Sequence, residues 1–147
     1  MEYRTLGRTG VKLSAFGLGA MMFGSWGNAD VDECHRMVAL ALDSGINLID
    51  TADIYSSGQS EEIVGKAIRG RRDEVVLATM YSSMSKGPNE RGNSRLWIKR
   101  SVEASLRRLD TDHIDIYQLH RPDPATDIEE TLSALDDLIR QGKILYT

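Results

Sequence analysis

The sequence is poor in several features, and each shortage excludes a class of structure. Among its 147 residues there is one cysteine, Cys34, so no internal disulfide can form. The hydrophobic residues, 41% of the chain, form no uninterrupted run that approaches ~18 residues, so no membrane-spanning helix is expected. The N-terminus has no basic segment followed by an apolar run, so we expect no signal peptide and a cytoplasmic protein.

The charge balance excludes a second set of functions. The chain carries 18 lysine and arginine residues against 22 aspartate and glutamate residues, which gives a formal net charge of −4. A slightly acidic protein gives no reason to expect binding to nucleic acid or to a membrane surface. No pair of histidine, cysteine or carboxylate residues has the spacing of metal ligands, so we expect no metal site.

The sequence does contain a regular alternation of strand-like and helix-like segments after an N-terminal hairpin. Tyr3–Leu6 and Val11–Ser14 predict the hairpin, because they flank a turn rich in glycine. Five strand-like runs follow, at Phe16–Met21, Ile46–Ala52, Glu74–Thr79, Ile114–Leu119 and Lys143–Thr147. Helical periodicity fills the intervals between them. We predict N-terminal caps for the last three helices at Ser60, at Ser94 and in a capping box at Thr126–Glu129.

This alternation, with a period of roughly 30 to 40 residues, predicts an α/β fold with a parallel sheet and crossover helices. Nothing in the composition marks a domain boundary, so residues 1–147 are expected to form one domain. The hairpin, four strand–helix units and the start of a fifth strand would make about the first half of a (β/α)8 barrel, which typically needs ~250 residues. Leu48, Leu77 and Ile116 would line its uncovered inner surface. Lys143–Thr147 would offer an unpaired strand edge to another chain.

The residues with chemical potential lie at or just after strand ends, where parallel α/β folds gather functional side chains. Asp50, Met80 and His120 are predicted to hold equivalent strand-end positions, and Tyr55 follows its strand closely. Taken singly, Asp50, Tyr55 and His120 each have an ordinary structural explanation, as a cap, a loop phenol and a hydrogen-bonded imidazole. Together they suggest proton transfer, because a tyrosine hydroxyl can protonate a carbonyl oxygen while a hydride reaches the carbon. A nearby ammonium would lower the tyrosine pKa of ~10, but Met80 stands at that place and a thioether carries no charge.

Several motifs together resemble the N-terminal half of the aldo-keto reductases, in the family's order and spacing. They are the N-terminal hairpin, Gly17-Leu18-Gly19, Asp50-Thr51-Ala52 with Tyr55, Gly58-Gln59-Ser60-Glu61, Gly87-Pro88-Asn89-Glu90-Arg91-Gly92, Ser105-Leu106-Arg107-Arg108-Leu109 and Tyr117-Gln118-Leu119-His120. The resemblance extends over essentially the whole chain. It implies an eight-stranded α/β barrel that uses NADPH, or less often NADH, to reduce small aldehydes and ketones to alcohols.

The resemblance also implies catalytic roles by position. Asp50 would be the supporting carboxylate, Tyr55 the general acid and His120 the residue that orients the carbonyl. Met80 occupies the position of the family's lysine, so we expect impaired turnover. Lys86, farther along the loop, is a poor substitute.

Further residues would surround the reacting groups if the resemblance holds. Ala20 and Met21, together with Asp50, would approach the cofactor, and Met22 and Trp26 would line the substrate pocket. The family's main cofactor-binding loops belong to the second half of the barrel, so weak cofactor binding is expected from residues 1–147 alone.

Three interpretations stay open at this point. The chain is a reductase-derived domain with weak or no turnover, or a non-catalytic interaction module, or an incomplete gene product that folds poorly. In the second case its open strand would pair with a second copy or with a complementing half-barrel.

Overall fold

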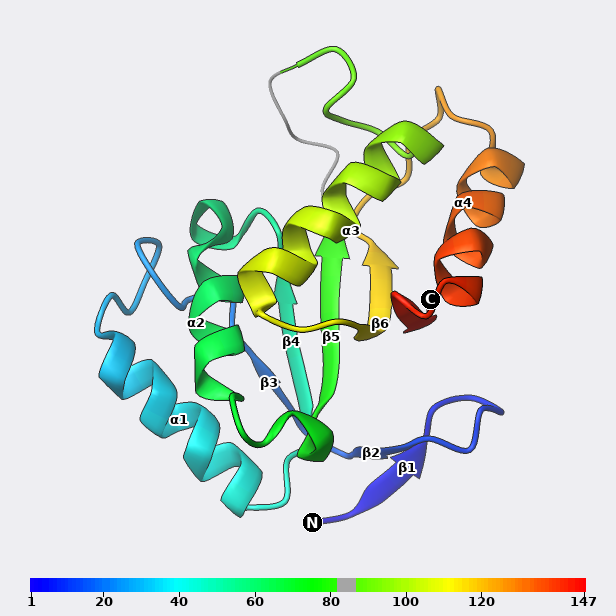
Figure 1. The fold of residues 1–147 in the computed structure, drawn as a ribbon. Coiled ribbons are helices and arrows are strands. Elements are labelled where there is room, and N and C mark those ends of the chain that lie inside the picture. Colours follow the sequence, from blue (N-terminus) through cyan, green and yellow to red (C-terminus); the bar gives the residue numbers. More distant parts are fainter. Residues whose placement is uncertain (82–86) are drawn as a thin grey trace.

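The computed structural model describes residues 1–81 and 87–147, and its main feature is a five-stranded parallel sheet. The strands lie in chain order as β3 (Gly17–Gly19), β4 (Leu48–Ala52), β5 (Val76–Tyr81), β6 (Ile114–Leu119) and β7 (Ile144–Tyr146). An antiparallel hairpin of β1 (Tyr3–Thr5) and β2 (Lys12–Ser14) lies near the N-terminal ends of these strands (Figure 1). The predicted α/β class and the hairpin are therefore confirmed.

Helices connect the parallel strands and cover one side of the sheet. They are α1 (Val31–Asp43), α2 (Gln59–Ala67), α3 (Arg95–Leu109) and α4 (Ile128–Arg140), with short 3-10 turns η1 (Tyr55–Gly58) and η2 (Arg72–Glu74). Figure 1 shows α3 crossing in front of β4 and β5, with α1 and α2 to the left of these strands and α4 to the right. Strands in sequential order with helices on one side are typical of a barrel segment. Within the described residues, no helix is long and apolar enough to cross a membrane.

The two faces of the sheet differ in burial, because successive strand residues point to opposite faces. Ile49, Leu77 and Tyr117 lie on the helix-covered face and are fully buried. Leu48 and Ile116 lie on the other face and are only half-buried. The prediction that Leu77 lines the uncovered surface was wrong, since the register pairs it with Ile49 beneath the helices. Leu48 and Ile116 do lie on the uncovered face.

Two features of the core are distinctive. The fully buried rings of Tyr81 and Tyr117 stack with their centroids 5.2 Å apart. Cys34 on α1 is also fully buried, and its Sγ donates a hydrogen bond of 3.5 Å to the carbonyl oxygen of Asn28. Burial raises the pKa of the Cys34 thiol. The one cysteine of the chain thus serves as a small core residue.

The predicted caps were correct in one case of three. Ser94 caps α3 through its side chain, as predicted. Ser60 does not cap α2; it lies inside the helix, fully buried, and donates a hydrogen bond of 2.7 Å to the carbonyl oxygen of Ala20. The predicted capping box is replaced by a cap at Asp127, one residue after Thr126. Both errors arise where another side chain or a tertiary contact competes for the same hydroxyl.

A buried ion pair joins α2, β5 and α3. The Glu61 carboxylate on α2 is fully buried and accepts hydrogen bonds from Thr79 Oγ1 (2.7 Å) and Arg108 Nε (2.6 Å). Thr79 lies on β5 and Arg108 on α3, so one carboxylate satisfies donors from two other elements. Two hydrogen bonds and a counter-charge offset the cost of removing this carboxylate from water.

The burial asymmetry of the sheet predicts unequal effects of two similar truncations. Leu77→Ala is expected to lower the free energy of unfolding by about 2–5 kcal/mol, because it empties space in a packed core. Leu48→Ala on the uncovered face is expected to cost clearly less. Urea denaturation of both variants measures the difference, and equal losses would contradict the assignment of faces.

The ion pair predicts a large penalty when one partner is lost. Arg108→Met would leave Glu61 buried without its counter-charge and is expected to cost about 3–5 kcal/mol of stability. The double variant Glu61→Gln/Arg108→Met should recover part of that loss, because no charge is then left buried. Thermal or urea unfolding of the single and double variants would show this; a double variant no better than Arg108→Met speaks against the argument.

Candidate functional site

The predicted site residues gather on the uncovered face of the sheet, toward the C-terminal ends of the strands. Asp50 pairs in register with Gly19 on β3 and Ala78 on β5, whereas Met80 pairs with Gln118 on β6. Residues paired in register point to the same side, and so do residues two apart in one strand. Asp50, Met80 and Gln118 therefore share the uncovered face. The prediction that Asp50, Met80 and His120 hold equivalent positions was wrong. Asp50 lies two residues earlier in the register than Met80, and His120 lies two residues beyond Gln118, the partner of Met80.

Tyr55 is carried by the turn that follows β4. This turn contains two consecutive serines in the left-handed region, Ser56 at φ 49° and Ser57 at φ 57°. Such a conformation is unfavourable for residues other than glycine and persists where surrounding contacts fix it. Here the fully buried Ser56 Oγ donates to the carbonyl oxygen of Phe23 (3.0 Å) and accepts from the backbone N–H of Trp26 (3.1 Å). The turn thus positions Tyr55 and the loop that carries Trp26 together.

Three rings meet at this end of the sheet. The Tyr55 and His120 rings are 6.0 Å apart between centroids and nearly perpendicular, at 85°. The Trp26 and Tyr55 rings are 6.3 Å apart and tilted by 56°. The backbone N–H of His120, one residue past β6, donates to the carbonyl oxygen of Tyr81 (3.2 Å), so the strand ladder orients the imidazole. Within the described residues, His120 Nδ1 is buried and has no hydrogen-bond partner.

Burial raises the pKa values of both Asp50 and Tyr55. Burial raises the pKa of Asp50, while a hydrogen bond of 3.3 Å from Gln118 Nε2 and the nearby His120 act in the opposite direction. Burial also raises the pKa of Tyr55, and the negative charge of Asp50 raises it further. An ammonium beside the phenol would have the reverse effect on its pKa. Lys86 lies outside the described residues.

Gln118 is a site residue that sequence reasoning missed. It lies within the Tyr117-Gln118-Leu119-His120 motif, two residues before His120, and it therefore faces the same side of the sheet. Strand alternation combined with the position of His120 was the signal that could have identified it. A neutral amide attracts less attention than a charged side chain, although here it contacts Asp50 directly.

Of the residues predicted to surround the reacting groups, Ala20 is buried, whereas the side chains of Met21, Met22 and Trp26 are exposed. The backbone of Ala20 is engaged within the protein: its N–H donates to the Asp50 carbonyl (2.8 Å), and its carbonyl oxygen accepts from Phe23 N and Ser60 Oγ. Ala20 is also fully buried, so the prediction that it approaches a cofactor was wrong for this structure. The side chains that remain available are half-exposed, as the exposed fractions show for Met21 (49%), Met22 (51%) and Trp26 (51%).

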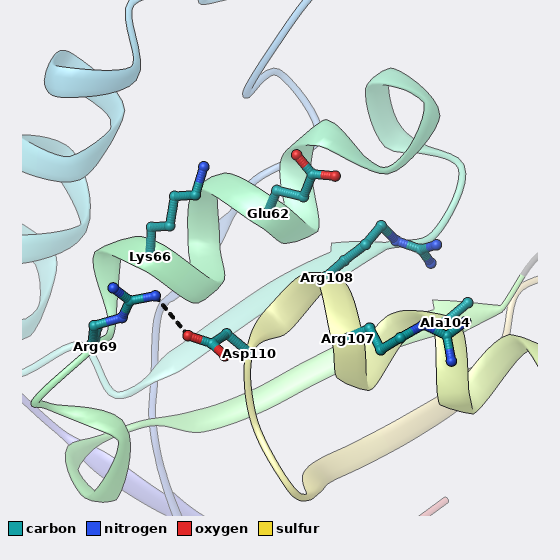
Figure 2. Close-up of a pocket in the computed structure, with 7 residues that line it drawn as sticks. All are labelled: Glu62, Lys66, Arg69, Ala104, Arg107, Arg108 and Asp110. Carbon is teal, nitrogen blue, oxygen red and sulfur yellow. Dashed lines mark hydrogen bonds and ion pairs between the residues drawn. The ribbon is translucent and has the colours of Figure 1, made fainter.

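A hollow lies on the outer side of the molecule, between α2 and α3. Figure 2 shows its charged lining: Glu62, Lys66, Arg69, Ala104, Arg107, Arg108 and Asp110. Arg69 reaches Asp110 across the two elements at 2.7 Å, while the Lys66 and Arg107 side chains point away from each other. Because these cations do not converge, the hollow offers no common point for an anion. We therefore do not assign a function to it.

Comparisons with known sequences point to one family. The sequence model described as "Aldo/keto reductase family" matches residues 15–147. Aldo-keto reductase YhdN of Bacillus subtilis is 47% identical over 98% of this chain and 45% of its own length. A probable voltage-gated potassium channel subunit beta of Arabidopsis thaliana is 40% identical over 99% of this chain and 45% of its own length. The chain thus spans about half the length of the curated relatives it matches.

A solved structure agrees with these matches. The holo form of aldo-keto reductase AKR11C1 from Bacillus halodurans superposes with a TM-score of 0.89 at 39% sequence identity. The superposition covers 99% of this chain and 49% of the other. The sheet described above thus corresponds to about half of an aldo-keto reductase barrel.

The raised pKa of Asp50 predicts a pH-dependent effect on stability. Because the folded state holds the proton more tightly than the unfolded state, ionised Asp50 opposes folding above its raised pKa. This cost vanishes below the ordinary value near 3.8, where both states are protonated. Asp50→Asn should therefore raise the melting temperature at pH 7, and the gain should shrink toward zero near pH 4. A destabilised variant at pH 7 would show that Asp50 is a net structural support.

Proposed function

Because this chain belongs to the aldo/keto reductase family, we propose that it builds a carbonyl-reduction site in which proton donation is weakened by Met80. The substrate class is small aldehydes and ketones, which would be reduced to alcohols. The observation that carries the proposal is the environment of Tyr55. Burial and the charge of Asp50 raise the pKa of Tyr55, and the residue of β5 on the same face of the sheet as Asp50 is Met80, a thioether.

Tyr55 is the proposed general acid. As hydride adds to the carbonyl carbon, negative charge develops on the oxygen, and a phenol within hydrogen-bonding reach can transfer its proton there. The transfer is favoured when the donor pKa lies near the working pH, and Tyr55 is shifted in the opposite direction. A bound carbonyl could still be polarised by the Tyr55 hydroxyl, but we expect slow turnover.

His120 and Asp50 have supporting roles in this proposal. His120 lies edge-on to Tyr55, so an imidazole nitrogen can help to orient the carbonyl oxygen toward the phenol. Asp50 would normally hold a cation beside the phenol, but here its described partner is the Gln118 amide at 3.3 Å. The carboxylate is therefore kept in place without the charge that would activate Tyr55.

The described residues fit a flat cofactor ring in one respect. Gly19 lies beside Asp50 in the register, and a side chain added at Gly19 would meet no atom within 4 Å, which leaves open space on the uncovered face. Ala52 and Ala78 continue this face with small side chains. When bound there, NADPH, or alternatively NADH, would supply the hydride. Gly19, Asp50 and the backbone near Met21 are the groups proposed to contact it.

Restoring the missing cation is expected to restore turnover. Met80→Lys should lower the pKa of Tyr55 and raise NADPH-dependent reduction of a reactive aldehyde by about 100-fold, the lower range for general acid catalysis. The measurement is NADPH oxidation at 340 nm with saturating aldehyde. Met37→Lys, which adds the same charge on the exposed side of α1, is the matched control and should change nothing.

Whether the gain in turnover depends on Tyr55 decides how the assay is interpreted. Adding Tyr55→Phe to Met80→Lys should abolish the gain, since the proton donor is then lost. The proposal is overturned if the native chain already turns over rapidly in a Tyr55-dependent manner. It is also overturned if Met80→Lys binds NADPH and aldehyde but shows no gain.

A second candidate function is binding to another protein without turnover. It is favoured by the relatives named as probable voltage-gated potassium channel beta subunits, which are 40% and 39% identical to this chain. In this alternative the chain pairs with a second copy, or with a complementing half-barrel, through its sheet edge. Sedimentation velocity at micromolar concentration separates the cases, because a monomer with no partner dependence removes the self-pairing version.

A further inference from the structure

The site combines negative charge with accessible aromatic surface. Asp50 contributes a carboxylate, and among the described residues the hydrogen-bond partner of its side chain is a neutral amide, Gln118. Gln118, which binds Asp50, lies two residues before His120, and the His120 ring is 6.0 Å from the Tyr55 ring, so the carboxylate belongs to the same cluster as the phenol. A half-buried carboxylate whose described hydrogen-bond partner is a neutral amide attracts cations from solution.

The aromatic part forms an angled wall next to this charge. Trp26 is 51% exposed and lies 6.3 Å from Tyr55 with a tilt of 56°, and His120 stands nearly perpendicular to Tyr55 at 6.0 Å. Aromatic faces attract cations through their quadrupole, and tryptophan does so most strongly. The half-exposed thioethers of Met21 and Met22 add polarisable surface nearby.

The backbone of the loop that carries Trp26 is held by hydrogen bonds to the segment that carries Tyr55. The Trp26 N–H is bound by Ser56 Oγ (3.1 Å), and the neighbouring Ser25 N–H by Gln59 Oε1 (3.0 Å). A side chain at Gly24, whose φ is +96°, would lie 2.9 Å from Ser56 Cβ, so the loop sits directly against the turn that carries Tyr55. The backbone of Trp26 is therefore pre-organised, which reduces the entropy lost when a ligand binds.

We propose that this site binds ligands that carry an organic ammonium group, quaternary ammonium in particular. The ligand cation would lie between the Asp50 carboxylate and the faces of Trp26 and Tyr55 and would supply the positive charge that Met80 lacks. Among carbonyl compounds of similar size, those with an ammonium group are then preferred over neutral and anionic ones. The inference shares with the proposed function the grouping of Asp50 and Tyr55 in one site, but it does not require turnover.

The test compares two molecules of the same shape and different charge. Choline and 3,3-dimethyl-1-butanol differ in one atom of the trimethyl group, nitrogen against carbon, and both can be titrated by isothermal calorimetry at low salt. Choline is expected to bind about 5- to 30-fold more tightly, the range given by cation–π attraction in a partly desolvated site. Equal binding of the two molecules, or no binding of choline at millimolar concentration, overturns the proposal.

Variants assign the preference to this site. Asp50→Asn, Trp26→Leu and Met80→Lys should each reduce the preference for choline, the last because a lysine would compete for Asp50. Asp73→Asn removes one negative charge at the opposite end of β5 and should leave the preference unchanged. A preference that survives both Asp50→Asn and Met80→Lys places the cation elsewhere and refutes the proposal.

Met80→Lys also keeps the two proposals separable. Gain of turnover in that variant tests the reductase proposal, and loss of choline binding tests the ammonium proposal. A variant that loses choline binding but gains no turnover supports the ligand class and removes the catalytic interpretation. A variant that gains turnover but keeps choline binding supports the reductase proposal and removes the ammonium proposal. Circular dichroism of each variant confirms that the fold is retained.

Discussion

The hydrogen bonds of one short segment, Ser56–Glu61, connect the sheet, the helix layer and the candidate site. Ser56 holds the loop before α1, Ser60 joins that loop to β4 through the Ala20 carbonyl and Thr51, and Glu61 binds β5 and α3. Because these side chains are fully buried, each missing bond would leave an unsatisfied polar group in a dry environment. The left-handed serines within the segment are the local cost of bringing these contacts together.

The stabilising polar contacts and the candidate site lie on opposite faces of the sheet. The face beneath the helices holds the satisfied charge, Glu61 with Arg108, and the stacked aromatic pair. The uncovered face holds Asp50, whose side chain is bound by a neutral amide. Among the residues that the structure describes, the charge beneath the helices is paired with an opposite charge, whereas the carboxylate on the uncovered face is bound by a neutral amide.

Much of the fold could be predicted from sequence, because apolar periodicity reports directly which residues are buried. The strand Ile114–Leu119 and the helices around Val38 and Val102 were predicted from this periodicity. The errors occurred where the environment across space decides. Leu77 was assigned to the wrong face because a continuous apolar run does not show which side is covered. Ser60 matched the pattern of a cap, yet the Ala20 carbonyl, 40 residues away, binds its hydroxyl.

The proximity of the candidate residues could be predicted from the sequence, but their contacts could not. Asp50, Tyr55 and His120 were found from strand ends and family resemblance, and the structure brings them together. Their unequal depth in the register and the Gln118 contact could not be read from one sequence, because both depend on how neighbouring strands align. The partnership of Trp26 with Tyr55 likewise requires the loop to fold back over a turn 30 residues later.

The burial of Cys34 has a practical consequence. Cys34 is the sole thiol of the chain and lies on the buried side of α1 with no solvent contact. Burial raises its pKa. Alkylating reagents attack the thiolate, so labelling must wait until α1 separates from the sheet. The rate of Cys34 labelling, measured by mass spectrometry, therefore reports how often α1 opens. No engineered probe is needed.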